Sequence, residues 1–299
     1  FAMDRVVDRV ARRLGLDPAE VRLRNLVRAE EFPYDVGLYY RDGHRLIYDS
    51  GDYVGGLRLA LERVGYEAFR AEQTRLRARG RYLGAGFACY TEGTAVGPFE
   101  GAVVRVDGSG KVLVATGACC QGQGHETTFA QIAADALGVD LNDVTIVEGD
   151  TAAIPFGFGT LASRSIVLAG NALALAAAKP KAKSLQMAAE LLEARAEDLV
   201  AEGNRIFVKG APSRAVTWRQ VAAAAAPGGL GPAAESPGLE AAHYLRPSTV
   251  TYAYGANAVT VEVDIETGAV RILKYVLVHD CGRSVNPMIV DAQMEGGTV

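Results

Sequence analysis

The sequence is poor in cysteine and histidine, with four of each among 299 residues. Cys119 and Cys120 are adjacent and no CxxC pair occurs, which excludes a zinc ribbon and a disulfide-based scaffold. The histidines form neither an HExxH nor an HxH pair, so their spacing predicts no metal site held by side chains; they are His44, His125, His243 and His279.

Long apolar runs and an excess of positive charge are also missing. The longest apolar stretch, residues 166–178, is shorter than the ~20 residues that span a bilayer. No signal peptide is visible, and we expect a cytoplasmic protein. With 31 Lys and Arg against 35 Asp and Glu, the net charge is −4, which disfavours nonspecific nucleic-acid binding and polybasic membrane binding.

What is present is apolar material for a sizeable core, since 49% of the residues are hydrophobic. The length allows two domains or one large one. The first residue is Phe1, and both ends fall inside predicted elements. We therefore expect the chain to be part of a larger protein.

The expected organisation begins with a helical N-terminal segment over residues 1–80. It includes helices that end near Gly15 and Leu26, and another over about residues 53–79. Residues 81–226 form a first subdomain, 227–248 a linker or surface loop, and 249–299 the truncated start of a second subdomain.

The first subdomain is predicted in more detail. Strands are expected at 84–90, 101–106 and 112–116, a glycine-rich loop at 117–124, a helix from about Glu126 to Gly138, and a strand at 144–147. A Gly/Pro/Phe loop follows at 151–160. Helix is predicted from near Ser163 to about Lys179 and again from Lys183 to Arg195.

The pattern that starts at Ala102 returns at Ala258, 156 residues later, and each copy reads as a β-hairpin. The alternative is that any two hairpins look alike. We predict an α+β fold of two similar subdomains, each with a β-hairpin or sheet and packed helices.

Three loops each lead into a predicted helix start: Gln121–His125, Thr160–Ser165, and the segment from Cys281 to Pro287. In the third, Asn286 is the expected N-cap and Pro287 the first helical residue. Helix N-termini bind anions readily, and three of them suit an extended ligand with phosphates or polar rings. The alternative is that the loops only connect elements. Neither a Walker A loop nor a GxGxxG fingerprint is present.

Other candidates have simpler interpretations. Neighbouring strand residues point to opposite faces, so His279, Asp280 and Cys281 are not expected to form a triad. Cys119 and Cys120 are interpreted as buried packing or as a loop against a cofactor. The carboxylates Glu92, Glu100 and Glu126 are interpreted as solvated or structural, and Trp218 as a core anchor.

Taken together, these motifs resemble a known family. The residues are Gln121-Gly122-Gln123-Gly124-His125-Glu126-Thr127-Thr128, then Gly159-Thr160 with Ala162-Ser163-Arg164-Ser165, then Val278-His279-Asp280-Cys281-Gly282 with Asn286-Pro287 and Gln293. The chain resembles the molybdenum-binding large subunit of the xanthine dehydrogenase/aldehyde oxidase family, most closely its carbon monoxide dehydrogenase branch.

This resemblance implies a molybdopterin cofactor in its cytosine dinucleotide form. It implies that Gln123 lies beside the pterin and metal, with Gly124 and His125 in the same loop, and that Gln121 also binds the cofactor. Thr160, Ala162, Ser163, Arg164 and Ser165 would hold the pyrophosphate and nucleotide, and Cys281, Asn286 and Gln293 the remaining pterin or cytosine. The pterin dithiolene, and no protein side chain, would hold the metal.

The resemblance also implies a reaction and partners. The reaction would be oxidative hydroxylation of an aldehyde or N-heterocycle with oxygen from water, or oxidation of carbon monoxide. An iron–sulfur subunit with [2Fe–2S] clusters and an FAD subunit would complete a heterotrimer, expected to dimerise. The family's catalytic glutamate would lie beyond Val299, and the copper-carrying cysteine loop of the carbon monoxide oxidising members before Phe1. The alternatives are a fragment that binds no ligand and an unrelated nucleotide-phosphate binder.

Overall fold

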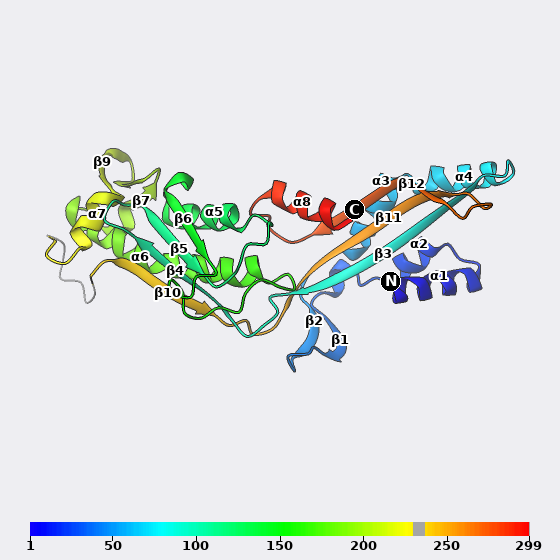
Figure 1. The fold of residues 1–299 in the computed structure, drawn as a ribbon, viewed down its shortest axis with the longest axis horizontal. Coiled ribbons are helices and arrows are strands. Elements are labelled where there is room, and N and C mark those ends of the chain that lie inside the picture. Colours follow the sequence, from blue (N-terminus) through cyan, green and yellow to red (C-terminus); the bar gives the residue numbers. More distant parts are fainter. Residues whose placement is uncertain (230–236, 299) are drawn as a thin grey trace. The chain divides into compact units, whose positions relative to one another are not determined.

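The computed structural model describes residues 1–229 and 237–298, which divide into two compact units. Unit 1 comprises Phe1–Gly93, Thr251–Ser284 and Met294–Val299, and unit 2 comprises Thr94–Val250 and Val285–Gln293. Both contain helices and strands, which confirms the α+β class (Figure 1). The boundaries predicted at residues 80, 226 and 248 stay a prediction.

Unit 1 opens with helices whose ends are set by local capping. Asp17 accepts hydrogen bonds from the amides of Ala19 and Glu20, and Pro18 occupies the first helical position, as predicted. Gly15 ends the first helix at φ +67°. The elements up to residue 94 are α1 (Ala2–Leu14), α2 (Pro18–Asn25), the 3-10 turn Ala29–Glu31, β1 (Tyr34–Tyr39), β2 (Arg45–Tyr48), α3 (Tyr53–Val64), α4 (Tyr66–Arg77) and β3 (Tyr82–Thr94).

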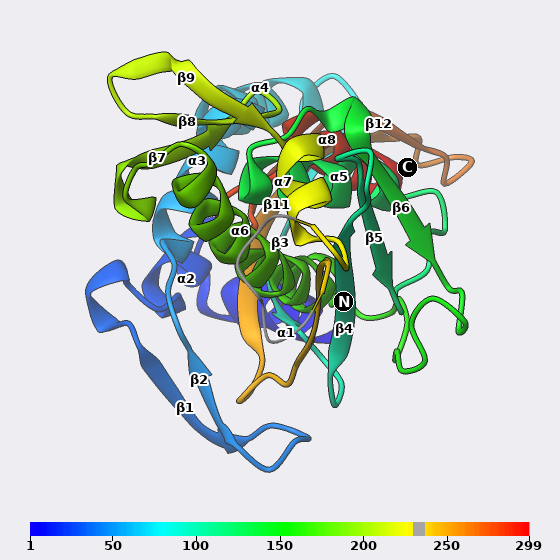
Figure 2. The same ribbon diagram turned by 90° about the vertical axis from the view of Figure 1, so that its left-hand side faces the viewer.

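The helix predicted over residues 53–79 is two helices. Gly65 has φ +76° and both ends α3 and precedes α4. A left-handed residue cannot continue a right-handed helix, so the chain turns there. The preceding tyrosine-rich stretch forms β1 and β2, a two-stranded antiparallel ribbon of their own (Figure 2).

The main sheet of unit 1 has the order β12-β11-β3, built with β11 (Thr251–Val263) and β12 (Val270–Asp280). β11 and β12 form an antiparallel hairpin, as predicted. Helix α3 lies against β11 and β12, where Leu57 and Ala60 pack with Phe87, Ala256 and Ala258. This cluster is the core that joins the first hundred residues to the strands that follow residue 250.

Unit 2 is organised around a four-stranded sheet in the order β10-β4-β5-β6. Its strands are β4 (Glu100–Val106), β5 (Val112–Thr116), β6 (Val144–Glu148) and β10 (Leu239–Leu245). β4 and β5 form the predicted hairpin, whereas β5 and β6 are parallel. Helix α5 (His125–Leu137) connects β5 to β6 and ends at Gly138, as predicted.

Strand β10 corrects part of the predicted linker. Residues 239–245 pair with β4 along their whole length, and Leu239 is buried. The predicted linker at 230–236 lies outside the described residues. The inward-facing positions of β10 are two leucines, one alanine and one histidine, which is a weak strand signal in a single sequence.

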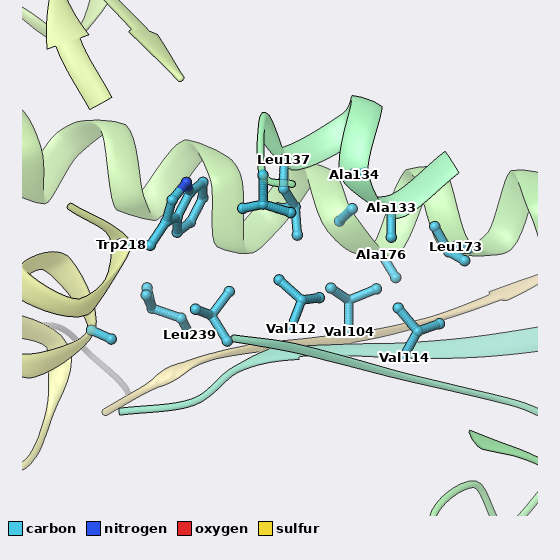
Figure 3. Close-up of a cluster of buried hydrophobic side chains, with 14 of the residues drawn as sticks. Val104, Val112, Val114, Ala133, Ala134, Leu137, Leu173, Ala176, Trp218 and Leu239 are labelled. Atoms are coloured by element: carbon cyan, nitrogen blue, oxygen red, sulfur yellow. The ribbon is translucent and has the colours of Figure 1, made fainter. Parts of the chain in front are cut away.

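Two helices cover the sheet of unit 2. Helix α6 (Asn171–Leu191) lies against β4, β10 and α5, and a π-turn, Ile166–Gly170, precedes it. The sequence predicted a break near Pro180, but α6 runs through it. Pro180 is buried inside the helix, so packing of the surrounding alanines holds the turn that lacks one hydrogen bond. Figure 3 shows Val104, Val112 and Val114 pointing from the sheet toward Leu137, Ala133 and Ala176.

A small second sheet completes unit 2, with β7 (Leu199–Glu202), β8 (Arg205–Val208) and β9 (Ala211–Thr217), and with α7 (Trp218–Ala225) after it. Trp218 is buried in the core of unit 2, as predicted. The last helix is α8 (Pro287–Thr298). Among residues 1–229 and 237–298, no helix has the length and apolar character that crossing a membrane requires.

The fold predicts a contrast between two leucines of α3. Leu57 is fully buried, whereas Leu59 is 39% exposed. Leu57→Ala removes packed methyl groups and is expected to cost about 2–5 kcal/mol of unfolding free energy. Leu59→Ala, with the same change of volume and helix propensity, is expected to cost less than about 1 kcal/mol. Thermal unfolding midpoints of the two variants test this, and equal losses would contradict the placement of α3.

Candidate functional site

The parallel pair β5 and β6 creates an edge where two loops begin side by side. Thr116 at the end of β5 lies opposite Glu148 at the end of β6. The loop of residues 117–124 follows β5, and the loop of residues 149–165 follows β6. Loops at the carboxyl ends of parallel strands are where α/β proteins bind ligands. Two of the three predicted loops therefore meet at one edge of unit 2, which we call the loop edge.

The first loop is held by its own glutamine. Gln123 Oε1 accepts a hydrogen bond from the Gln121 amide at 2.5 Å, and Gln123 Nε2 donates to the Cys119 carbonyl at 3.5 Å. Gly122 has φ +97° and open space around it. The loop thus turns its backbone around one side-chain amide, while Gln121 and Cys120 stay exposed.

His125 and Glu148 fix the start of α5 to the end of β6. His125 Nδ1 lies 2.9 Å from Glu148 Oε1, and both side chains are buried. Burial raises the pKa of Glu148, while hydrogen bonds from His125 and from the Cys120 backbone amide oppose the rise. The Glu148 carboxylate therefore connects the middle of the first loop, at Cys120, and the start of α5, at His125, to the end of β6.

Thr160 joins the first loop to the second. The Cys119 amide donates to Thr160 Oγ1 at 3.0 Å, and the Ser165 hydroxyl donates to the same oxygen at 3.2 Å. Two predicted residues of the second loop are thus bonded to each other and to the first loop.

Arg164 lies inside the loop edge, where Glu100 faces it. Arg164 Nη1 donates to Glu100 Oε2 at 2.7 Å, and both side chains have no exposed surface. Its other donors reach the carbonyls of Val96, Phe99 and Gly159. The sequence expectation placed Arg164 on the phosphates of a ligand, and the alternative was a surface charge. The structure instead turns the guanidinium inward.

Three residues other than glycine have left-handed backbone here, one between β3 and β4 and two in the second loop. They are Ala95 (φ +62°), Ala162 (φ +45°) and Ser163 (φ +54°). The Ala95 amide donates to the Ser163 carbonyl at 3.4 Å, so the strained residues are bonded across two loops. Ala162 and Ser163 are exposed. Such strain gathers at ligand and active sites, where surrounding structure maintains it.

The third loop reaches the same unit through Asn286. Asn286 Oδ1 accepts a hydrogen bond from the Ile289 amide at 3.3 Å, and α8 begins at Pro287, which confirms the predicted cap. Asn286 Nδ2 donates to Gln131 Oε1 of α5 at 3.0 Å. At Gly124 a Cβ atom would lie 2.6 Å from Ile289 Cδ1, so the glycine permits close packing of α8.

The remaining predicted residues are more scattered. Gln293 is exposed on α8 within unit 2, whereas Cys281 is exposed in unit 1. Cys119 and Cys120 are exposed free thiols, which corrects their interpretation as buried packing.

His279 and Asp280 have separate partners. His279 Nδ1 lies 2.8 Å from the Tyr90 hydroxyl, and Asp280 accepts a hydrogen bond from Tyr254. Burial lowers the pKa of His279. These separate contacts agree with the expectation that no triad forms. Within the part of the chain that the structure describes, no three His, Cys, Asp or Glu side chains gather where they could hold a metal ion.

Sequence reasoning missed Glu148 and Gln131. Glu148 could have been found as the last residue of a strand at the carboxyl edge. Gln131 carries no local signal, because its partner lies 155 residues away in sequence.

Comparison with known proteins decides the family. The model of the molybdopterin cofactor-binding domain matches residues 59–299. The chain belongs to this family. It is 38% identical to the carbon monoxide dehydrogenase large chain of Hydrogenophaga pseudoflava, with 99% of this chain and 38% of the relative covered. It is 36% identical to the 6-hydroxypseudooxynicotine dehydrogenase complex subunit gamma of Paenarthrobacter nicotinovorans, over 100% of this chain and 37% of the relative.

A solved structure agrees. The crystal structure of a Cu,Mo-CO dehydrogenase in its carbon monoxide reduced state matches with a TM-score of 0.88 and 37% identity, over 99% of this chain and 38% of that one. The chain therefore spans less than two fifths of the length of these relatives.

In this member of the family, the junction of α5 and α8 gives a sharp prediction. Asn286→Ala removes both the helix cap and the bond to Gln131, and is expected to cost about 1–2 kcal/mol of unfolding free energy. Asn286→Asp keeps a capping oxygen, and Gln131 can turn its amide to donate, so less than half of that loss is expected. Thermal unfolding of both variants decides the matter: equal losses would show that the cap contributes nothing.

Proposed function

We propose that this chain is part of the large subunit of a molybdenum hydroxylase and that its loop edge binds molybdopterin cytosine dinucleotide. The observation that carries the proposal is the set of bonds by which Thr160 joins the second loop to the first, His125 joins the first loop to the end of β6, and Asn286 joins the third loop to α5. Motifs up to 165 residues apart in sequence, from Gln121 to Asn286, are thereby assembled within one unit.

The residues at the loop edge fit such a ligand. The exposed groups of Gln121, Gly122, Ala162 and Ser163 offer amides, carbonyls and a hydroxyl without a charged side chain. A pterin needs paired donors and acceptors, and a pyrophosphate accepts hydrogen bonds from amides at loops and helix starts. The loop at 117–124 suits the pterin, and the loop at 160–165 suits the pyrophosphate and nucleotide.

Besides His125, Ala162 and Ser163, the predicted residues are interpreted as follows. Gln121 and Gln123 orient the pterin, and Gly124 lets α8 approach. Thr160 and Ser165 hold the two loops together beneath the phosphates. Asn286 and Gln293 contribute from the start and the body of α8, whereas the role that the resemblance gives to Cys281, which belongs to unit 1, stays a prediction. Arg164 acts through the loop that it holds.

When bound, the cofactor supplies the redox chemistry of oxidative hydroxylation with oxygen from water, or of carbon monoxide oxidation. This chain's own residues bind and orient it. The buried carboxylates at the loop edge are engaged with side-chain partners, since Glu100 pairs with Arg164 and Glu148 pairs with His125. We assign no catalytic residue within the chain.

The substrate class is a small molecule: an aldehyde, an N-heterocycle or carbon monoxide. Relatives named for carbon monoxide and for 6-hydroxypseudooxynicotine are 38% and 36% identical, so overall similarity does not select between them. The name of the second relative describes a complex subunit. We propose an iron–sulfur subunit and an FAD subunit as partners, in a dimer of heterotrimers, in the cytoplasm. The exposed free thiols of Cys119, Cys120 and Cys281 suit a reducing compartment.

The proposal is tested on the full-length subunit purified with its partners. Molybdenum is measured by elemental analysis, and nucleotide is identified after acid hydrolysis. We expect molybdenum and CMP in equal amounts per subunit. A folded complex with neither would overturn the proposal, whereas another nucleotide with molybdenum would overturn only the cytosine form.

Gln123→Ala tests the role of the first loop. Its amide makes two hydrogen bonds in an exposed loop, so the loss of unfolding free energy is expected near 1 kcal/mol. Molybdenum and CMP content are expected to fall together. Gln220→Ala is the matched control, since Gln220 accepts from the Thr217 amide in the capping box of α7. It is expected to cost similar stability with full cofactor content, and an unchanged content in Gln123→Ala would refute the role.

A further inference from the structure

We propose that Glu100 and Arg164 are positioning residues whose buried ion pair sets the shape of the cofactor-binding loops. The proposal rests on the proposed function of the loop edge. It assigns to the pair an effect on ligand retention in addition to its effect on folding.

Arg164 directs two of its donors to the short segment that precedes β4. Its Nε donates to the Val96 carbonyl at 2.7 Å and its Nη2 to the Phe99 carbonyl at 2.5 Å. The guanidinium also lies 5.0 Å from the centre of the Phe158 ring. One side chain of the second loop thereby fixes the backbone that enters β4.

Glu100, the first residue of β4, accepts hydrogen bonds from the second loop. Its Oε2 accepts hydrogen bonds from the amides of Phe158 at 3.3 Å and Gly159 at 3.0 Å, besides the bond from Arg164. The carboxylate therefore holds the approach to Thr160, the residue that bonds to the first loop.

The first loop crosses directly beside this carboxylate. A Cβ atom on Gly117 would lie 2.3 Å from the Gly157 Cα and 2.7 Å from Glu100 Oε1. Two glycines thus let the two loop backbones touch against the buried ion pair. Any shift of Glu100 would be transmitted to both loops.

The strained residues lie at the ends of this arrangement. Ala95 precedes Val96 by one residue, and Ala162 and Ser163 precede Arg164. Left-handed backbone at such residues persists only where surrounding contacts over-determine it. The Arg164 contacts to Val96 and Phe99 provide that constraint, together with the bond from the Ala95 amide to the Ser163 carbonyl. Because Ala162 and Ser163 are exposed, the conformation that the pair imposes is the one a ligand meets.

A purely stabilising role would not need this chemistry. Apolar residues of similar volume often stabilise a core as well as a buried ion pair does. What they cannot supply is hydrogen bonding to three carbonyls and two amides from separate loop segments.

The experiment compares variants in the purified, cofactor-loaded complex. Glu100→Gln removes the charge at nearly constant volume, and Arg164→Lys keeps the charge but cannot reach Val96 and Phe99 together. Leu137→Ala is the matched control, because Leu137 is fully buried in unit 2 and its contacts are apolar. Measured for each are the thermal midpoint, and the molybdenum and CMP retained per folded subunit after gel filtration.

Both loop variants are expected to retain the cofactor about tenfold less tightly or worse, the range for losing charge-assisted hydrogen bonds. Leu137→Ala is expected to lower the midpoint at least as much and to keep its cofactor. Wild-type retention in both loop variants, or an equal loss in Leu137→Ala, would overturn the proposal. If Glu100→Gln fails to fold, Arg164→Lys decides.

A second readout does not depend on the cofactor. Chymotrypsin cuts after exposed aromatic and leucine residues, and Phe158 and Leu161 are each 45% exposed in the second loop. Cleavage there is expected to be faster in the apo forms of both loop variants than in apo Leu137→Ala. Equal cleavage rates would overturn the positioning role, whereas a wild-type complex without molybdenum or CMP would overturn only the proposed function.

Discussion

The loop edge depends on one buried ion pair, Glu100 with Arg164. Neither side chain has exposed surface, so both lose their hydration on folding. Such a pair persists because every strong donor and acceptor finds a partner, and removing one member costs about 3–5 kcal/mol. Here the partners are mainly carbonyls and amides of loops, with the Gly101 amide of β4 besides. The stability of the ion pair therefore depends on the conformation of the loops that bond to it.

Strand topology decides which loops can be coupled in this way. The parallel pair of β5 and β6 brings both loop starts to one edge, and α5 returns the chain between them. Glu148 then bonds to His125 at the far end of the first loop. The Glu148 side chain is only 9% exposed, and this burial raises the pKa of its carboxyl group. Hydrogen bonds in such surroundings are stronger than in water, so few of them suffice to hold an otherwise exposed loop.

The parts of this structure that could be predicted from sequence have local causes. The cap at Asp17, the end of α5 at Gly138 and the start of α8 after Asn286 each depend on a few neighbouring residues. The break at Gly65 is equally local, yet helical periodicity continues through it and hides it.

The parts that could not be predicted depend on distant partners. From the sequence, Arg164 is interpreted as a phosphate ligand, because no neighbouring residue indicates that it pairs with Glu100, 64 residues earlier. β10 becomes a strand because β4 offers a free edge, and not because its own pattern is strong. Three loops could be identified by their glycines and helix starts, but the residues that hold them together, Glu148 and Gln131 among them, become visible only when strands and helices are packed.

Backbone strain connects stability to ligand binding at this edge. Ala95, Ala162 and Ser163 have left-handed conformations, each costing of the order of 1–3 kcal/mol. Glycine would remove most of that cost, yet it would also free the loop, since glycine visits many conformations at similar energy. Alanine and serine give fewer alternatives, so a loop that is forced into the strained shape stays in it. The ion pair holds the loop in the strained conformation, and the alanine and serine side chains restrict the other conformations that the backbone can adopt. A ligand that meets such a loop loses little free energy in ordering it, which is the physical advantage of pre-organisation.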